Sequence, residues 1–197
     1  MPTRPEQAPL VGERIYLRAP RTSDAGAFLE AARRSRRLHA RWVVAPLTRD
    51  AFEAYRARFG GRNVLTRTHV GFLALRRDDD SPVGVLNFSE IVRGSFQSAY
   101  LGYYGFRPHT GQGLMKEALG LALDAAFGPL ALHRVEVNVQ PRNVRSVGLV
   151  RALGFAREGF SRRYLRIGDR WCDHVRYAML AEDWRALRRR AARATRR

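Results

Sequence analysis

Short stretches of the chain alternate apolar and polar residues, and this period of two predicts β-strands. A turn at residues 78–82 separates two such stretches, and Gly168 and Asp169 separate the last two, so each pair is expected to form an antiparallel hairpin. The expected strands cover residues 14–18, 70–75, 83–88, 99–106, 133–139, 156–165 and 171–180.

Other stretches place apolar residues every three or four positions, which predicts helices. The expected helices cover residues 25–37, 49–59, 111–127 and 143–153. Residues 22–24 offer side-chain oxygens that can cap the start of the first helix. Gly60 and Gly61 are expected to end the second helix, and Gly154 the fourth.

The strands and helices follow one another without an internal repeat or a linker-like segment. The 197 residues suit one domain, because domains usually run to roughly 100–200 residues. The expected organisation is a flexible N-terminus over residues 1–12, one α+β (mixed α/β) domain over residues 13–181, and a basic tail over residues 182–197 that is either helical or disordered.

The chain carries a formal net charge of +18, and Lys116 is its only lysine. Such a charge attracts a polyanion such as RNA, or an anionic cofactor. The alternative is a codon bias toward arginine, which explains the choice of arginine over lysine better than the excess of cations over anions. The sequence leaves both interpretations open.

Cysteine usage and hydropathy indicate the compartment. Cys172 is the only cysteine, so no disulfide can form within the chain, and this fits a reducing cytosol. No apolar run approaches the ~20 residues of a membrane helix, and residues 1–12 lack the apolar core of a signal peptide. We therefore expect a cytoplasmic protein that does not associate with membranes. No group of His, Cys and Asp has metal-ligand spacing, so no metal is expected.

Residues 101–119 predict a strand, a glycine-rich loop and a helix, in that order. Gly111 and Gly113 allow the loop backbone to approach a ligand closely. The first amides of the helix have no partner inside the helix and, together with its dipole, form a site for an anion such as a pyrophosphate. Gly-x-Gly alone is a weak signal, and an ordinary strand-to-helix turn is the alternative.

A second junction between a strand and a helix carries Asn143 and Ser146. The Asn143 side chain can cap the helix by accepting a hydrogen bond from the Ser146 N–H, which is a structural role. Alternatively, both side chains face the end of the preceding strand, where they can bind a cofactor.

Several short segments form a familiar pattern when they are read in order. They are Asn87-Phe88-Ser89, Val92-Arg93-Gly94-Ser95-Phe96, Tyr100-Leu101-Gly102-Tyr103, Gly111-Gln112-Gly113-Leu114-Met115 with Glu117-Ala118-Leu119, His133-Arg134, Asn138, Pro141, Asn143, Arg145-Ser146, Leu153-Gly154-Phe155, Glu158-Gly159, and Trp171 with Asp173-His174-Val175. In this order they resemble the GNAT acetyltransferases, and more closely the ribosomal-protein-alanine N-acetyltransferases of the RimJ/RimL type. The resemblance covers about residues 12–184.

The resemblance implies a GNAT acyl-CoA N-acyltransferase fold, with a central, mostly antiparallel sheet flanked by helices. It also implies transfer of an acetyl group from acetyl-CoA to an amine. Backbone N–H groups near residues 104–106 are implied to stabilise the oxyanion, and Asn143 and Ser146 to bind the pantetheine arm and the sulfur of CoA. The residues implied to contact acetyl-CoA are Tyr104, Gly105, Phe106, Thr110, Gly111, Gln112, Gly113, Leu114, Met115, Lys116, Asn143 and Ser146.

The catalytic candidates are Ser146, Glu90 and Asn138. Ser146 is the best-placed donor to the leaving thiolate. Glu90, Glu136 or a water held by Asn138 are candidates to accept the amine proton. Glu90 fits equally a solvated strand end, and Glu136 an outward-facing strand position.

Two positions depart from the family pattern. Pro108 stands three residues before the first loop glycine, where the general motif has Gln or Arg. Residues 163–165 contain no carboxylate, although RimL-like enzymes have a candidate glutamate base in this region. A protein α-amine, with a pKa near ~7.7–8.0, needs less help from a base than a lysine amine near ~10.4, so this absence favours an α-amine acceptor.

Three functions remain under comparison. The leading one is acetylation of the N-terminal α-amine of a ribosomal or other protein, by direct attack in a ternary complex, with a weak RNA contact through the arginine-rich surface. The second is acetylation of a small amine such as an antibiotic or polyamine. The charge of +18 argues against a polyamine, because like charges repel. The third is a ribosome- or RNA-binding factor that keeps the fold. Trp171, Asp173 and His174 either line a substrate groove or pack structurally.

Overall fold

The computed structural model describes residues 10–59 and 67–194. Its helices are α1 (Ala25–Arg34), α2 (Arg36–His39), α3 (Arg49–Ala57), α4 (Leu114–Phe127), α5 (Val144–Ala152) and α6 (Ala181–Ala194). Its strands are β1 (Leu10–Val11), β2 (Ile15–Arg18), β3 (Val70–Arg76), β4 (Pro82–Val92), β5 (Ser98–Gly105), β6 (Arg134–Val139), β7 (Ala156–Ile167) and β8 (Arg170–Leu180). Across the part of the chain described, no helix is long and apolar enough to cross a membrane.

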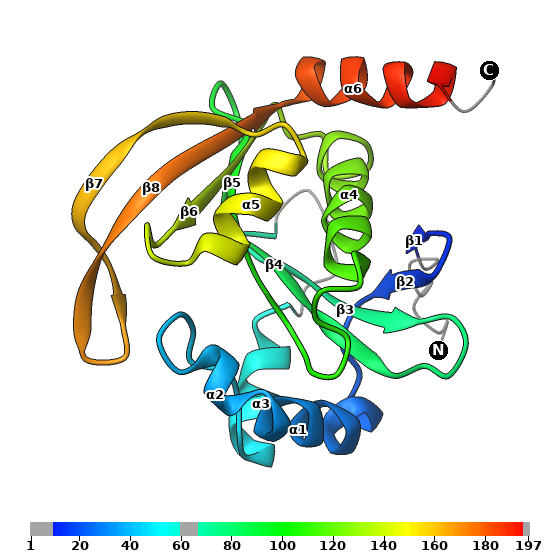
Figure 1. Cartoon of the computed structure of the whole chain (residues 1–197), viewed down its shortest axis with the longest axis vertical. Helices are drawn as coiled ribbons and strands as arrows, with labels where there is room; N and C mark the ends of the chain where they lie inside the picture. The colour runs from blue at the N-terminus through cyan, green and yellow to red at the C-terminus, as the bar shows by residue number, and fades with distance from the viewer. Residues whose placement is uncertain (1–9, 60–66, 195–197) are drawn as a thin grey trace.

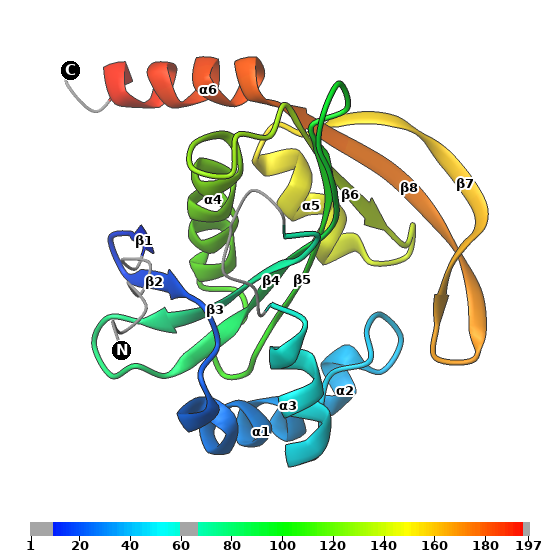
Figure 2. The same cartoon turned by 180° about the vertical axis from the view of Figure 1, so that it is seen from behind.

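The described strands form one sheet in the order β1-β2-β3-β4-β5-β6-β8-β7. Every neighbouring pair is antiparallel except β5 and β6, which run parallel. The long β7–β8 hairpin projects beyond the body of the sheet in both views (Figures 1 and 2). The expected fold class, a mixed α/β domain with a mostly antiparallel sheet flanked by helices, is confirmed, as are the two predicted hairpins.

Two hydrophobic clusters cover the two faces of this sheet. Strand alternation sends Leu86 and Phe88 of β4 into the larger cluster, which contains α4, α5 and the buried residues of α6. Val85 of the same strand points into the smaller cluster with α1 and α3. The predicted apolar face of α4 is buried, with Leu114, Ala118, Ala122 and Ala125 in the larger cluster. The sheet is therefore the middle layer of three.

Glycines bring α4 unusually close to the sheet. A Cβ at Gly84 would lie 2.6 Å from the Met115 sulfur and 2.5 Å from the Tyr104 carbonyl oxygen, so a larger residue does not fit there. Gly84 pairs with Gly105 across β4 and β5. The first turn of α4 thus rests directly on the end of β5, which fixes the position of the loop between them.

The predicted first helix, residues 25–37, is wrong in one respect, because it breaks at Ser35 into α1 and α2. The Ser35 hydroxyl is buried and accepts a hydrogen bond from the Arg107 N–H at 2.9 Å, a long-range contact that periodicity does not reveal. The predicted cap is present one turn earlier than expected. Asp24 accepts a hydrogen bond from the Arg21 N–H at 2.6 Å, which caps the 3-10 turn Thr22–Asp24 that precedes α1. It makes no side-chain cap bond to α1 itself and also accepts two hydrogen bonds from the Arg18 guanidinium, both of 2.7 Å.

Both ends of the chain are more regular than expected over the residues described. Leu10 and Val11, assigned to a flexible segment, pair with β2 as β1. The basic tail begins with a fourteen-residue helix, α6, whose Trp184 is buried in the larger cluster. Gly60 and Gly61, predicted to end the second helix, lie outside the described residues, as do residues 195–197 of the tail.

Candidate functional site

The parallel strands β5 and β6 separate partway along their length. Their pairing covers only Ser98 to Tyr100 on β5 and Arg134 to Glu136 on β6. Beyond it, β5 continues to Gly105 beside β4 alone, and β6 continues to Val139 beside β8 alone. The sheet therefore has an opening between the ends of these two strands. Backbone groups that face it have no partner strand, and those without another hydrogen-bond partner are available to a ligand.

The loop after β5 leads from this opening to the start of α4. Gly111 and Gly113 have φ angles of 83° and 78°, a left-handed conformation that glycine adopts without strain. Gly113 is the N-cap of α4, and no side chain caps the helix there. A Cβ at Gly111 would meet no atom within 4 Å. The uncapped amides thus face open space, as an anion site at a helix start requires.

The structure separates the loop residues by role. Gly111, Gln112, Gly113 and Lys116 are exposed and Thr110 is partly buried. Leu114 belongs to the core and Met115 packs against it, so only their backbone amides are free to meet a ligand. The seven predicted loop residues lie together around the start of α4.

Arg14, between β1 and β2, holds this loop from outside. Its guanidinium donates to the Gln112 carbonyl at 3.0 Å and to the Glu117 carboxylate at 3.1 Å. Glu117 also accepts from the Arg14 backbone N–H at 2.8 Å. The sequence does not reveal this role of Arg14, because its partners lie about a hundred residues away and no local pattern signals them.

Asn143 and Ser146 occupy the first turn of α5. The Asn143 side chain accepts a hydrogen bond from the Ser146 N–H at 3.3 Å, so the proposed structural role as N-cap is present. The Ser146 hydroxyl lies 2.7 Å from the Tyr103 hydroxyl of β5. Burial raises the pKa of Tyr103 to about 12, although its hydrogen bond with Ser146 lowers it. Tyr103 therefore remains a neutral phenol near pH 7.

Asn138 lies on β6 two residues past Glu136, where the pairing with β5 ends. Its side-chain oxygen is buried and has no hydrogen-bond partner. A buried acceptor without a partner is costly unless a ligand or a water supplies a donor. The structure thus places Asn138 in the opening with an unused acceptor.

Of the three backbone N–H groups implied to stabilise the oxyanion, those of residues 104–106, only one is free to do so. The Phe106 N–H already donates to the Val83 carbonyl of β4 at 2.7 Å, so it is not free. Successive N–H groups along a strand point to opposite sides, so that of Tyr104 also faces β4 and that of Gly105 faces the opening. The Tyr104 and Phe106 side chains pack in or against the smaller cluster, on the face away from α4.

Glu90, a candidate base from the sequence, lies away from the opening. It occupies a bulge of β4 opposite the closed end of the β5–β6 pair, and its side chain is 69% exposed. Glu136 lies where the pairing ends, but Arg134 binds its carboxylate at 2.9 Å. Arg134 also binds Glu158 and holds the pKa of that carboxyl below its usual range. Both glutamates next to Arg134 are thus ion-paired.

The last hairpin is divided between packing and exposure. His174 is buried, and Asp173 accepts a hydrogen bond from the Arg163 N–H at 2.7 Å, which are structural roles. Trp171 is 61% exposed and is available to a partner. His109 is also buried, with its Nε2 3.1 Å from the Ser81 hydroxyl.

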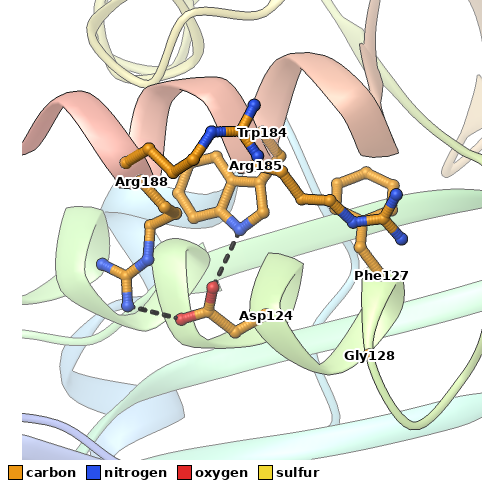
Figure 3. A pocket seen from close by; sticks show the side chains of 7 residues that line it. Asp124, Phe127, Gly128, Trp184, Arg185 and Arg188 are labelled. Carbon is orange, nitrogen blue, oxygen red and sulfur yellow. Dashed lines mark hydrogen bonds and ion pairs between the residues drawn. The ribbon is translucent and has the colours of Figure 1, made fainter.

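A separate cavity of about 330 Å³ lies between α4 and α6 (Figure 3). Asp124 of α4 accepts hydrogen bonds from the Trp184 indole at 2.8 Å and from the Arg188 guanidinium at 2.9 Å. Its remaining lining residues are Phe127, Gly128, Arg185 and Arg189. These contacts fix α6 to α4 and so to the domain.

Comparisons with known proteins agree with this geometry. Residues 14–156 match the family model described as acetyltransferase (GNAT) domain. The [ribosomal protein uS5]-alanine N-acetyltransferase of Escherichia coli is 43% identical over 107 residues, which cover 54% of this chain and 55% of that protein. The probable N-acetyltransferase YjcK of Bacillus subtilis is 40% identical over 105 residues, covering 53% and 58%.

A solved structure shows the likeness over a longer range. Mycobacterium smegmatis RimJ in complex with CoA-disulfide superposes with a TM-score of 0.74 at 27% identity, covering 86% of this chain and 83% of that one. By contrast, the matched part of the chain spans a little over half the length of the curated relatives above. The family model covers most of the chain, so the chain belongs to the GNAT acetyltransferase family.

Proposed function

We propose that this chain transfers the acetyl group of acetyl-CoA to the N-terminal α-amine of a protein, and that a ribosomal protein is its acceptor. The observation that carries the proposal is the opening between β5 and β6, with the uncapped start of α4 at its mouth. The 43% identity to an enzyme that acetylates a ribosomal-protein alanine supports the acceptor class.

The described residues fit acetyl-CoA in two independent ways. The amides of residues 111–115 offer donors to a pyrophosphate, whereas the Lys116 N–H already donates to the Gly113 carbonyl at 3.0 Å. No neighbouring side chain fills the space above Gly111. The unused oxygen of Asn138 offers an acceptor to an amide N–H of the pantetheine arm, or holds a water. A cofactor that lies along the opening would satisfy both kinds of group.

The reaction makes a nitrogen–carbon bond and breaks a carbon–sulfur bond. The neutral amine attacks the thioester carbonyl, the electron pair leaves on sulfur, and the amine proton passes to water. The Gly105 N–H faces the position where the oxyanion develops, and the Ser146 hydroxyl is the donor for the leaving thiolate.

A protein α-amine suits this site better than a lysine side chain. Its pKa near ~7.7–8.0 leaves a sizeable neutral fraction at neutral pH, so no strong base is needed. The carboxylate of Glu136 is ion-paired and Glu90 lies away from the opening, so neither acts readily as a base. A water near Asn138 is the remaining proton acceptor.

The same proposal includes a cytoplasmic location and a weak RNA contact through α6. The arginines Arg185, Arg189, Arg190 and Arg193 are exposed on this helix. No carboxylate among the described residues pairs with Arg185 or Arg189, so both guanidiniums are free to bind phosphates. Such a contact would bring the enzyme to its ribosomal acceptor.

A panel of acceptors tests the function. Release of CoA thiol is measured with acetyl-CoA and peptides that begin with alanine, with polyamines, with aminoglycosides and with no acceptor. We expect turnover on the peptides and little on the others. Faster turnover on a small amine would assign the chain to small-molecule acetylation. Tight RNA binding with no turnover on any amine would instead indicate a binding factor.

A further inference from the structure

The contact between Tyr103 and Ser146 joins the two sides of the opening. Tyr103 belongs to β5 and packs against the larger cluster, whereas Ser146 belongs to the first turn of α5, 43 residues later. Their hydroxyl oxygens are 2.7 Å apart, the usual distance for a hydrogen bond between two hydroxyl groups. The pairing is specific, because Tyr104 next in sequence points to the opposite face.

The need of each hydroxyl group for a hydrogen-bond partner indicates the direction of this bond. Among the described residues, Ser146 supplies the only hydrogen-bond partner of the Tyr103 hydroxyl. A largely buried phenol that did not donate its hydrogen would carry the cost of an unsatisfied donor, so Tyr103 donates to Ser146. Ser146 is partly exposed, and its own hydroxyl hydrogen is then free to turn into the opening.

We propose that Tyr103 is a positioning residue that directs the Ser146 hydroxyl hydrogen at the leaving sulfur of CoA. The inference rests on the proposed function, since it concerns the thiolate that acetyl transfer releases. When the carbon–sulfur bond breaks, the sulfur takes the electron pair and accepts a hydrogen bond from Ser146. The Ser146 oxygen at the same time accepts one from Tyr103. No proton leaves either residue, and the amine proton goes to water.

A simple strap between β5 and α5 is the competing role. A strap would matter for folding stability and not for the charge on sulfur. The two roles therefore predict different pKa values for a CoA thiol bound in the opening. They also differ in whether the effect of Tyr103 needs the Ser146 hydroxyl, which a double-mutant cycle measures.

The first test uses the binary complex with CoA and needs no turnover. The pKa of the bound CoA thiol is measured from thiolate absorbance in the full chain and in Tyr103→Phe, Ser146→Ala and the double variant. We expect it to rise by roughly one unit in each single variant, a tenfold change in thiolate fraction, with no further rise in the double variant. Tyr16→Phe is the control, because its hydroxyl bonds Asp80 at 2.8 Å outside the opening.

The second test follows turnover of the same four proteins. Tyr103→Phe is expected to lower kcat about tenfold in the Ser146 background and to have no effect in the Ser146→Ala background, with KM and CoA affinity within twofold. Equal losses of kcat in both backgrounds, or an unchanged thiol pKa in Tyr103→Phe, would overturn the proposal. If the full chain acetylates no amine, the proposed function fails, and the thiol pKa alone decides the role of Tyr103.

Discussion

At the scale of single residues, Gly113 links a backbone conformation to a ligand. Its φ of 78° excludes most side chains for reasons of strain, yet the space around it is open apart from Arg14 at 3.4 Å. A residue chosen only for a turn would not need open space on its outer side. The combination indicates that the loop is shaped to receive an anion.

Substitution at Gly113 separates strain from charge. Gly113→Glu is expected to weaken CoA binding at least tenfold in calorimetry, about 1.4 kcal/mol, because it places a carboxylate where the phosphates bind. Gly113→Ala should lose much less. Gly94→Glu is the matched control, since Gly94 also has a positive φ, of 69°, with no atom near its Cβ position. Equal CoA affinity in Gly113→Glu and the full chain would exclude the anion site.

His39 gives the molecule a pH dependence that sequence alone does not indicate. It is 5% exposed, and its Nε2 donates to the Gly105 carbonyl at 2.8 Å. Burial lowers its pKa from the usual 6.5, although the bond to Gly105 raises it. The folded state therefore binds fewer protons than the unfolded state just below pH 6.5, and the free energy of unfolding falls as pH falls there.

Urea unfolding at several pH values checks this. Between pH 7 and pH 5, we expect the free energy of unfolding to decrease, and to decrease less steeply in His39→Gln. Burial also lowers the pKa values of His109 and His174, so part of the slope remains in that variant. An identical slope in both proteins would show that His39 does not contribute.

Single residues also show which contacts can be predicted from the sequence. Asn143 was identified as both cap and ligand candidate, and its capping bond is present because it depends on residues three apart. The partners of Ser146 and Glu117, Tyr103 and Arg14, were not identified, since they lie 43 and 103 residues away. Local patterns encode local contacts, and these depend on the fold.

At the scale of elements, α6 is a fixed part of the domain and not a loose tail. Trp184 and Arg188 both bind Asp124 of α4, and Trp184 is buried. The large apolar residues of the helix face the domain, so its exposed side offers arginine, alanine and, in the first turn, Glu182 and Asp183. This surface suits phosphates better than lipid tails.

Salt dependence of RNA binding tests the α6 surface. Replacing Arg185 and Arg189 with glutamine is expected to weaken binding of a labelled single-stranded RNA and to reduce the slope of log K against log salt by about 1.4, at ~0.7 per phosphate contact. The control replaces Arg36 and Arg37 of α2, which are also exposed. Equal losses in both double variants would attribute binding to net charge and not to α6.

Most elements were predictable from periodicity, and the two exceptions have different causes. The break between α1 and α2 follows from Ser35 bonding the loop at Arg107, and β1 follows from pairing with β2. The first depends on a partner 72 residues away, and the second on pairing of a segment too short to show a period of two. The hairpins and α4 were predicted correctly, because their patterns and turns lie within the segments themselves.

At the scale of the whole molecule, the candidate site is arranged around the opening between β5 and β6. It exists because a parallel pair stands among antiparallel neighbours and stays paired over only three residues of each strand. The sequence predicts both strands but not their separation, so the site was placed by family resemblance. The net charge of +18 adds attraction for an anionic cofactor, and α6 places five of those cations on one helix.

One measurement tests the central claim most directly. A peptide with a free N-terminal alanine and an internal lysine is incubated with acetyl-CoA and the full chain, and fragment mass spectrometry locates the acetyl group. The account predicts acetylation at the α-amine, none at the lysine, and no reaction when the N-terminus is blocked. Acetylation at the lysine alone, or no acetylation of either amine while CoA binds, would contradict it.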